Sequence, residues 1–110
     1  MADSDKGLRY DQDKPMLSLL PAAALVEVAR VLTFGAKKYV ANNWAKGMEW
    51  SRVENSLLRH YARYKAGEKV DPESGLSHLA HLACNALFLL TYEIRGLGVD
   101  DRSTELMEDK

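Results

Sequence analysis

Cysteine is almost absent from the sequence, whose 110 residues include only Cys84. An internal disulfide is therefore excluded, and so is a zinc site built on paired cysteines. Because Cys84 lies within a long apolar segment, we expect a small buried core residue rather than an exposed nucleophile. The sequence also has no P-loop, no dinucleotide-binding glycine pattern and no nucleophile elbow, so none of these kinds of site is indicated.

Neither sign of charge is in excess, because 15 basic and 16 acidic residues leave a net charge of -1. This balance favours neither nucleic acid nor an anionic membrane as a partner. No apolar run of about 18 residues occurs without a polar interruption, and residues 1–14 are too polar for a signal peptide. We therefore expect a cytoplasmic protein.

No stretch of the sequence is typical of a β-strand, so we predict an all-α protein. A length of 110 residues corresponds to one domain, which we expect to be a small helical bundle with about three main helices. Residues 1–20 are predicted to form an irregular N-terminal arm, and residues 21–96 the helical domain. Residues 97–110 carry clustered acids and few large apolar side chains, so an acidic, disordered tail is predicted there.

The first predicted helix begins at Pro21, a residue suited to the first helical turn. It has two semi-apolar faces on opposite sides. The face expected to pack on the core carries Leu25, Val28, Ala29, Leu32, Ala36 and Tyr39. The other face, of mixed character, carries Glu27, Val31, Phe34 and Lys38. A helix with two such faces is usually packed between its own core and a second subunit, so we expect an oligomer.

The second predicted helix follows a loop over residues 41–50 and begins at Ser51. Ser51 and Glu54 have the spacing of a capping box, and Gly67 has the place of a residue that ends the helix. The periodicity directs His60 toward the core. The residues that the pattern predicts to be buried are Val53, Leu57, Tyr61 and Tyr64.

The third predicted helix, from His78 to Ile94, is apolar almost all the way round, which is typical of a helix buried on most of its sides. Its polar exceptions are His78, His81 and Asn85, which fall within an arc of roughly 60° at about 100° per residue. A buried polar group without a hydrogen bond costs on the order of 1–3 kcal/mol. This polar stripe therefore requires partners from elsewhere in the chain.

Five residues of the second half of the chain have side chains of the kinds that bind divalent cations. They are His60, Asp71, Glu73, His78 and His81. One interpretation is a metal site at the mouth of the bundle, built from facing helices. Two others stay open: the histidines are polar core or interface residues, and Asp71, which precedes a proline, is an N-cap whose neighbour Glu73 favours the helix dipole.

A second set of residues is suited to anions and bases. Its cations, any of which could approach phosphates, are Lys14, Lys37, Lys38, Arg59 and Arg63. Trp44 or Tyr39 could stack on a base. The alternatives are a solvated basic surface and, for Trp44, a lid over the core.

Three segments, in this order along the chain, resemble a known family: GAKKYVANNW, SLLRHYARYKAGE and DPESGLSHLAHLACNALFLL. They are similar to the small phage and prophage domain described as dATP/dGTP diphosphohydrolase, N-terminal, which is related to the MazG-like all-α nucleotide pyrophosphohydrolases. The resemblance covers about residues 9–95. It implies a phage- or prophage-encoded protein that hydrolyses a deoxypurine nucleoside triphosphate to the monophosphate and pyrophosphate. It also implies Mg²⁺ or Mn²⁺ and a homo-oligomer, either a dimer or a tetramer, formed through the bundle.

The chain departs from the MazG-like pattern at the metal ligands. Those enzymes use ExxE on one helix and ExxD on a later one, whereas the only ExxE here, from Glu105 to Glu108, lies in the tail. His78 and His81 stand where ExxD is expected, and the earlier helix has Arg59 and His60 in place of a glutamate pair. The resemblance therefore leaves a second interpretation open, a non-catalytic phage protein that binds or sequesters a nucleotide. A helical interaction module with a structural polar stripe is the third.

If the enzyme interpretation holds, the residues divide into three groups. Catalysis and metal binding are assigned to Asp71, Glu73, His78 and His81, with His60 as a further metal ligand. Phosphate binding is assigned to Lys14, Lys38 and Arg59, of which the last two would stabilise the leaving pyrophosphate. Recognition of the sugar and base is assigned to Asn43, Trp44 and Asn85.

Overall fold

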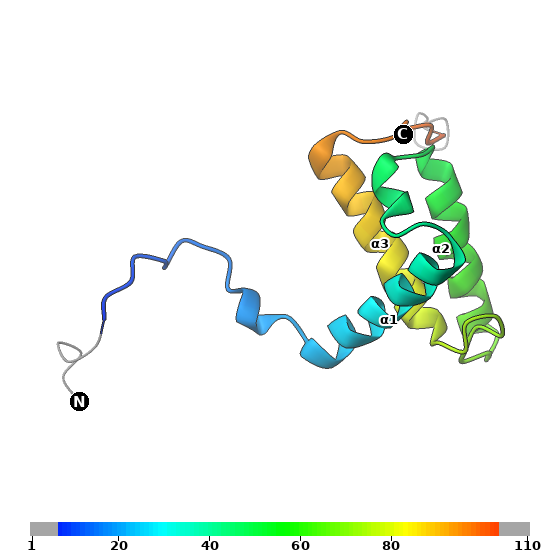
Figure 1. The fold of residues 1–110 in the computed structure, drawn as a ribbon, viewed down its shortest axis with the longest axis horizontal. Helices are drawn as coiled ribbons and strands as arrows, with labels where there is room; N and C mark the ends of the chain where they lie inside the picture. Colours follow the sequence, from blue (N-terminus) through cyan, green and yellow to red (C-terminus); the bar gives the residue numbers. More distant parts are fainter. Residues whose placement is uncertain (1–6, 104–110) are drawn as a thin grey trace, which may run out of the picture.

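The computed structural model describes residues 7–103 and contains three α-helices, with no strand in that range (Figure 1). The α-helices are α1 (Ala22–Lys38), α2 (Trp50–Lys65) and α3 (His78–Arg95). Two short 3-10 helices, η2 (Leu17–Leu19) and η3 (Asn43–Lys46), flank α1. The prediction of a small all-α bundle with three main helices is confirmed. None of the described helices is both long and apolar enough to cross a membrane.

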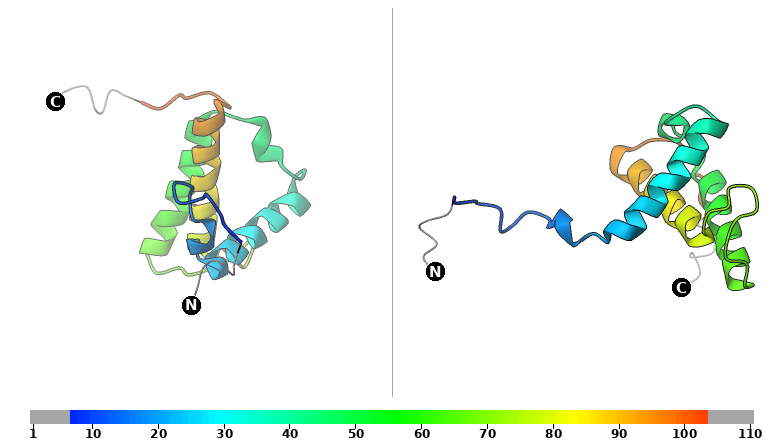
Figure 2. Two further views of the ribbon diagram at one scale, coloured as in Figure 1. Left: turned by 90° about the vertical axis from the view of Figure 1, so that its left-hand side faces the viewer. Right: turned by 60° about the horizontal axis from the view of Figure 1, so that its bottom comes forward.

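Helix α3 is the central element of the bundle. It runs antiparallel to α2 along its length, and α1 packs across it at an angle (Figures 1 and 2). The small core between α1 and α3 consists of Val28, Val31, Ala80 and Cys84. Cys84 is 2% exposed, and burial raises the pKa of its thiol to about 11. The prediction that this cysteine is a small buried core residue is thus confirmed.

The inward face of α1 is only partly the face that the sequence pattern predicted. Val28 of the predicted core face is buried, but so is Val31 of the opposite face, whereas Leu25 and Leu32 are 42% and 39% exposed. Ala29, Ala36 and Tyr39 of the predicted core face are exposed as well. The pattern was misleading because both faces are apolar, and periodicity alone does not distinguish an inner face from an outer one.

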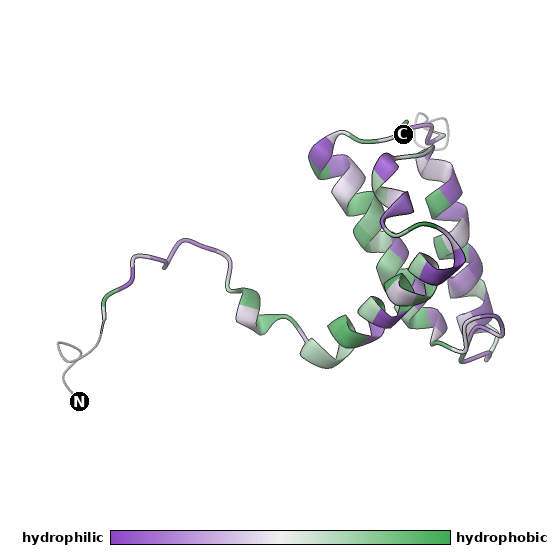
Figure 3. Ribbon diagram, in the orientation of Figure 1, coloured by the Kyte–Doolittle hydropathy of each residue, from purple (hydrophilic) through white to green (hydrophobic). Residues whose placement is uncertain are grey.

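One side of α3 also stays exposed in the single chain. Leu79, Leu87, Leu90 and Ile94 lie within about 80° on the helix, and each is at least 44% exposed. Figure 3 shows apolar residues along α3 and at the start of α1. The prediction that α3 is buried on most of its sides is therefore wrong for one copy of the chain, because α1 and α2 cover only part of its circumference.

The start of α2 is capped from a distance and not by the predicted capping box. The helix already begins at Trp50, so Ser51 lies inside it, and the N-cap residue Glu49 makes no side-chain cap. Instead, the Asp101 carboxylate accepts hydrogen bonds from the Ser51 backbone N–H at 2.9 Å and from its hydroxyl at 2.7 Å. The free N–H groups of a helix start are satisfied here by an acid far away in sequence.

At the end of α2, the prediction is confirmed for the glycine that ends the helix but is wrong for the two tyrosines. Gly67 follows the helix with a φ of 101°, a left-handed conformation that favours glycine. Val53 is buried as predicted, whereas Tyr61 and Tyr64 are 44% and 45% exposed. Their helical spacing predicted that these two tyrosines lie in the core. They lie outside it because α3 is the described helix that packs along the length of α2, and the far side of α2 faces solvent.

The two ends of the chain differ in their relation to the bundle. Residues 7–20 extend away from it, as an irregular arm would (Figure 1). Residues 97–103, predicted to be part of a disordered tail, instead contact the start of α2: the Trp50 indole donates to the Leu97 carbonyl at 2.9 Å, and Val99 pairs with Glu49. Residues 104–110, including the ExxE segment, lie outside the described residues. The domain division itself stays a prediction.

A buried tyrosine near the C-terminal end of α3 joins this helix to the η3 segment. Tyr92 is 0% exposed, and its hydroxyl donates to the Trp44 carbonyl at 2.6 Å. The Trp44 ring stacks on Phe88 with 4.5 Å between the ring centroids. These contacts from α3 fix the path that the chain takes after α1.

We expect Tyr92→Phe to lower the free energy of unfolding by about 1–2 kcal/mol, because the substitution leaves the Trp44 carbonyl without its donor. Urea denaturation followed by circular dichroism measures the change. Tyr61→Phe is the matched control, since Tyr61 is exposed and should tolerate the loss of its hydroxyl with little effect. Equal destabilisation by both substitutions would contradict the importance of this hydrogen bond.

Candidate functional site

A groove of about 1020 Å³ lies between the second half of α1, the η3 segment and the α2–α3 hairpin. Its volume is at the upper end of the range found for small-molecule sites. Of the predicted site residues, those that line the groove are Lys38, Asn43, Trp44, Arg59, His60, Asp71, Glu73, His81 and Asn85. His78 lies buried beneath it. Lys14 is on the extended arm and does not line the groove.

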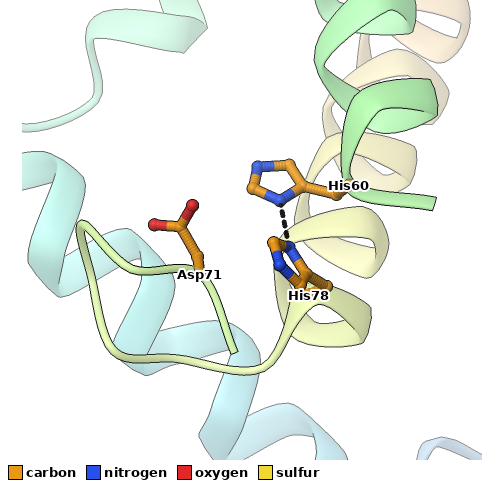
Figure 4. Close-up of side chains that lie close together, drawn as sticks. All are labelled: His60, Asp71 and His78. Carbon is orange, nitrogen blue, oxygen red and sulfur yellow. Dashed lines mark hydrogen bonds between the residues drawn. The ribbon is translucent and has the colours of Figure 1, made fainter. Parts of the chain in front are cut away.

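The three histidines form the floor of one end of the groove. The Nδ1 atoms of His60 and His78 are 2.9 Å apart (Figure 4). The ring of His60 also stacks on His81, with 4.4 Å between the centroids and 7° between the planes. The polar stripe of α3 therefore has polar partners on α2 and in the α2–α3 loop, as the need for hydrogen bonds predicted. Its third member, Asn85, donates to the Ser56 hydroxyl at 3.1 Å.

A carboxylate fixes the protons of the His78–His60 pair. The Nε2 atom of His78 is 2.8 Å from Glu68 Oε1, and this hydrogen bond is the main cause that lowers the pKa of Glu68. Glu68 is thus the acceptor, and the His78 Nε2–H donates to it. The other ring nitrogen of His78, Nδ1, shares a hydrogen with the Nδ1 of His60.

The loop between α2 and α3 adds an acid to this cluster. Val70 pairs with Ser77 across the loop, and Asp71 accepts from the Ser74 N–H at 2.9 Å. The Ser74 hydroxyl is 2.7 Å from His81 Nε2. Asp71 is therefore part of a turn and not the N-cap of α3, a role that Ser77 has instead by accepting from the Leu79 N–H. The alternative explanation of Asp71 as a helix cap is wrong.

Burial sets the charge state of the cluster. It lowers the pKa of His60 to about 4, an effect to which the neighbouring His81 also contributes, and it lowers the pKa of His81. Burial alone would raise the pKa of Asp71, but hydrogen bonds from Ser74 hold that pKa below its usual value. Near neutral pH, the site therefore combines the neutral imidazoles of His60 and His81 with the ionised carboxylate of Asp71.

Ligand atoms of three residues are close enough to surround one cation. One atom each from His60, Asp71 and His78 lies within 4.8 Å of the others (Figure 4). Of the other predicted metal ligands, Glu73 pairs with Lys38 at 2.7 Å, and His81 is engaged by Ser74. The structure thus brings together three of the five predicted ligands and gives the other two separate partners.

The remaining walls of the groove carry positive charge and amides. Arg59 and Arg63 of α2 line it, and so does Lys38 of α1. Arg52, Asn42 and Asn55 also line the groove, although no sequence pattern indicated them. The same holds for Glu68 and Ser74, the hydrogen-bond partners of His78 and His81. Glu68 lies in a polar loop where nothing but its negative charge distinguishes it, and only the folded loop brings it to His78.

Comparison with known proteins identifies relatives of the chain. The family described as dATP/dGTP diphosphohydrolase, N-terminal matches residues 4–102. A protein of Salmonella phage PMBT28 named dATP/dGTP diphosphohydrolase is 37% identical over 83 residues, which are 76% of this chain but only 28% of that relative. No solved structure matches the chain. Because the family match spans nearly all 110 residues, the chain belongs to the dATP/dGTP diphosphohydrolase, N-terminal family.

Proposed function

We propose that the groove binds a deoxypurine nucleoside triphosphate and that the protein hydrolyses it to the monophosphate and pyrophosphate. The observation that carries this proposal is that one groove contains both a basic wall and a cluster of imidazoles with a carboxylate. The name of the phage relative, dATP/dGTP diphosphohydrolase, supports the substrate class. A MazG-like origin and a place in the cytoplasm of the infected bacterium are part of the proposal.

The basic wall supports the position of the phosphates. Arg59 and Arg63 are one turn apart on α2, so their guanidinium groups can bind adjacent phosphates in the fork geometry that suits them. Lys38 is 37% exposed and bound to Glu73, and it lies at the opposite edge. Bound anions would thus be held from both α1 and α2, with the cluster of His60 and Asp71 at the end of the groove.

The amides of the groove support recognition of a purine. Asn42, Asn43, Asn55 and Asn85 line it, and an amide can bind the N6 and N7 edge of adenine with two hydrogen bonds. Asn85 has one of its donors engaged by Ser56, which orients the side chain. Trp44 stacks on Phe88 and so forms a flat apolar wall for the base.

The cluster is suited to activating water. Asp71 is a proton acceptor that lines the groove at this end, close to His60. A water bound to its carboxylate would attack the α-phosphorus and displace pyrophosphate, with its proton passing to Asp71. Mg²⁺ or Mn²⁺ would enter with the triphosphate as part of the substrate, because these ions prefer phosphate and carboxylate oxygens. The cluster itself, rich in nitrogen, does not fit Mg²⁺.

We expect the purified chain to convert dATP or dGTP, with Mg²⁺ or Mn²⁺ present, into the monophosphate and pyrophosphate. Chromatography resolves these products from a nucleoside and triphosphate, whose appearance would contradict the proposed bond cleavage. Asp71→Asn should lower kcat at least about 100-fold, because it removes an acceptor without changing the shape of the side chain. Glu93→Gln, on the solvent side of α3, is the control and should leave kcat unchanged.

Arg59→Ala should weaken the binding of dGTP about 10–100-fold, since a hydrogen bond to a charged group contributes about 1.5–3 kcal/mol. Calorimetry in the presence of a chelator measures binding without turnover. Arg30→Ala, at an exposed ion pair with Glu27 outside the groove, should bind as the unmodified chain does. Equal affinities of the two variants would show that the nucleotide binds elsewhere.

The alternative function is non-catalytic binding of a nucleotide, either to sequester it or to counter a host defence. A specific observation favours it: the cluster has a single carboxylate, Asp71, in place of the acidic pairs of MazG-like enzymes. Binding of dGTP that depends on Arg59 but yields no product would support this alternative. Absence of both binding and turnover would support a purely structural role for the polar stripe.

We further propose that the chain forms a homo-oligomer through the exposed apolar faces of α1 and α3. Leu87, Leu90 and Ile94 form one uncovered stripe, and Leu25 and Val26 are exposed on α1. A patch of this kind on a small protein is typical of an interface.

Leu90→Lys should shift the protein to monomers in light scattering coupled to size exclusion, because it places a charge in the proposed interface. Leu58→Lys, on the exposed side of α2, is the control and should keep the larger mass. A monomeric unmodified chain at all concentrations would contradict the proposal.

A further inference from the structure

We propose that His60, Asp71 and His78 form a site for a transition-metal ion that prefers nitrogen ligands, such as Zn²⁺, Co²⁺ or Fe²⁺, and not for Mg²⁺. The ion would lie in the groove assigned to the nucleotide, so its role in catalysis rests on the proposed function. Its binding does not, because it is measured without any nucleotide.

The chemistry of the ligand atoms indicates which ion the site prefers. Two of the three ligands are imidazoles, and a third imidazole, that of His81, stacks on His60 at 4.4 Å. Imidazole nitrogen suits zinc, iron and related metals, whereas Mg²⁺ takes a near-octahedral shell of oxygens. Asp71 is the cluster's one carboxylate. Glu73, the acid that could have changed this balance, is bound to Lys38 at 2.7 Å.

The geometry needs only small movements to hold an ion. Ligands at about 2.0–2.1 Å from a tetrahedral metal lie roughly 3.3 Å from one another. The Nδ1 atoms of His60 and His78 are 2.9 Å apart, and the ligand atoms of all three residues lie within 4.8 Å. These separations bracket the required value. Rotations of the His60 and Asp71 side chains, both of which line the groove, would close the remaining gap.

Glu68 prepares His78 for this role. Its carboxylate accepts the His78 Nε2–H at 2.8 Å and so directs the Nδ1 lone pair of this buried ring toward His60. A carboxylate behind a histidine is the usual second partner of a metal-binding imidazole. An ion between the two Nδ1 atoms would take the place of the hydrogen that they share. His60 would then carry its proton on Nε2, so no proton is lost from the pair.

The test is calorimetric titration of the full chain with Zn²⁺, Co²⁺ and Mg²⁺, each alone and near neutral pH. We expect one Zn²⁺ and one Co²⁺ per chain, both bound at least about 100-fold more tightly than Mg²⁺. The visible absorption of bound Co²⁺ reports coordination by the protein independently of the heat. Binding of Mg²⁺ as tight as that of Zn²⁺ would overturn the proposal.

Substitutions locate the site. His60→Ala and Asp71→Asn should each weaken Zn²⁺ binding more than about 100-fold. Glu68→Gln should weaken it about 10–100-fold, the usual effect of losing a hydrogen-bond partner of a metal ligand. Circular dichroism shows whether each variant is folded. If His60→Ala does not fold, Asp71→Asn decides the outcome, because it keeps the shape of the side chain. Zn²⁺ affinity that is unchanged in both His60→Ala and Asp71→Asn would overturn the assignment.

Two controls separate this site from other ligands nearby. Cys84→Ala removes the thiol that lines the groove, and Glu73→Gln removes the acid that pairs with Lys38. Both variants should bind Zn²⁺ as the unmodified chain does. A large loss in either would place the ion outside the His60–Asp71–His78 cluster and overturn the proposal. Hydrolysis by a chain that binds no Zn²⁺ would overturn this inference but leave the hydrolase function intact.

Discussion

The hydrogen bonds of one buried imidazole hold together the end of the bundle at which α2, the α2–α3 loop and the start of α3 meet. His78 is 0% exposed, and its ring contacts His60 of α2 on one side and Glu68 of the connecting loop on the other. Its backbone N–H donates to the Lys69 carbonyl at 3.0 Å. The first residue of α3 is thereby bound both to α2 and to the loop. Because a buried polar ring without partners is costly, these three elements are constrained to one arrangement.

This constraint also positions the acid of the site. The loop between α2 and α3 folds back on itself, with the Asp71 N–H donating to the Leu76 carbonyl at 2.8 Å. The loop is closed at its base by the Lys69–His78 hydrogen bond, so Asp71 has little freedom to leave the histidines. A carboxylate on a free loop would lose entropy when it binds a ligand. Here much of that cost is met during folding.

The sequence was informative wherever a residue had one physical explanation. The stripe of His78, His81 and Asn85 required polar partners, and the structure provides them. Gly67 ended α2 because its backbone conformation favours glycine. The inner face of α1 was not predictable, since both of its sides are apolar. Glu68 and Asp101 were not predictable either, because they act through contacts between residues distant in the sequence.

The width of the groove follows from the way α1 is attached. Helix α1 meets α3 through Val28 and Val31, which pack on the small residues Ala80 and Cys84, and beyond that contact it diverges from the hairpin (Figure 2). The end of α1 is tied to the α2–α3 loop by the Lys38–Glu73 ion pair, and the η3 segment is held to α3 by the hydrogen bond from Tyr92 to the Trp44 carbonyl. Between these attachments α1 and the η3 segment form one wall of the groove, and α2 and α3 form the other. The groove is thus open because the core between α1 and α3 is small and leaves the rest of α1 apart from the hairpin.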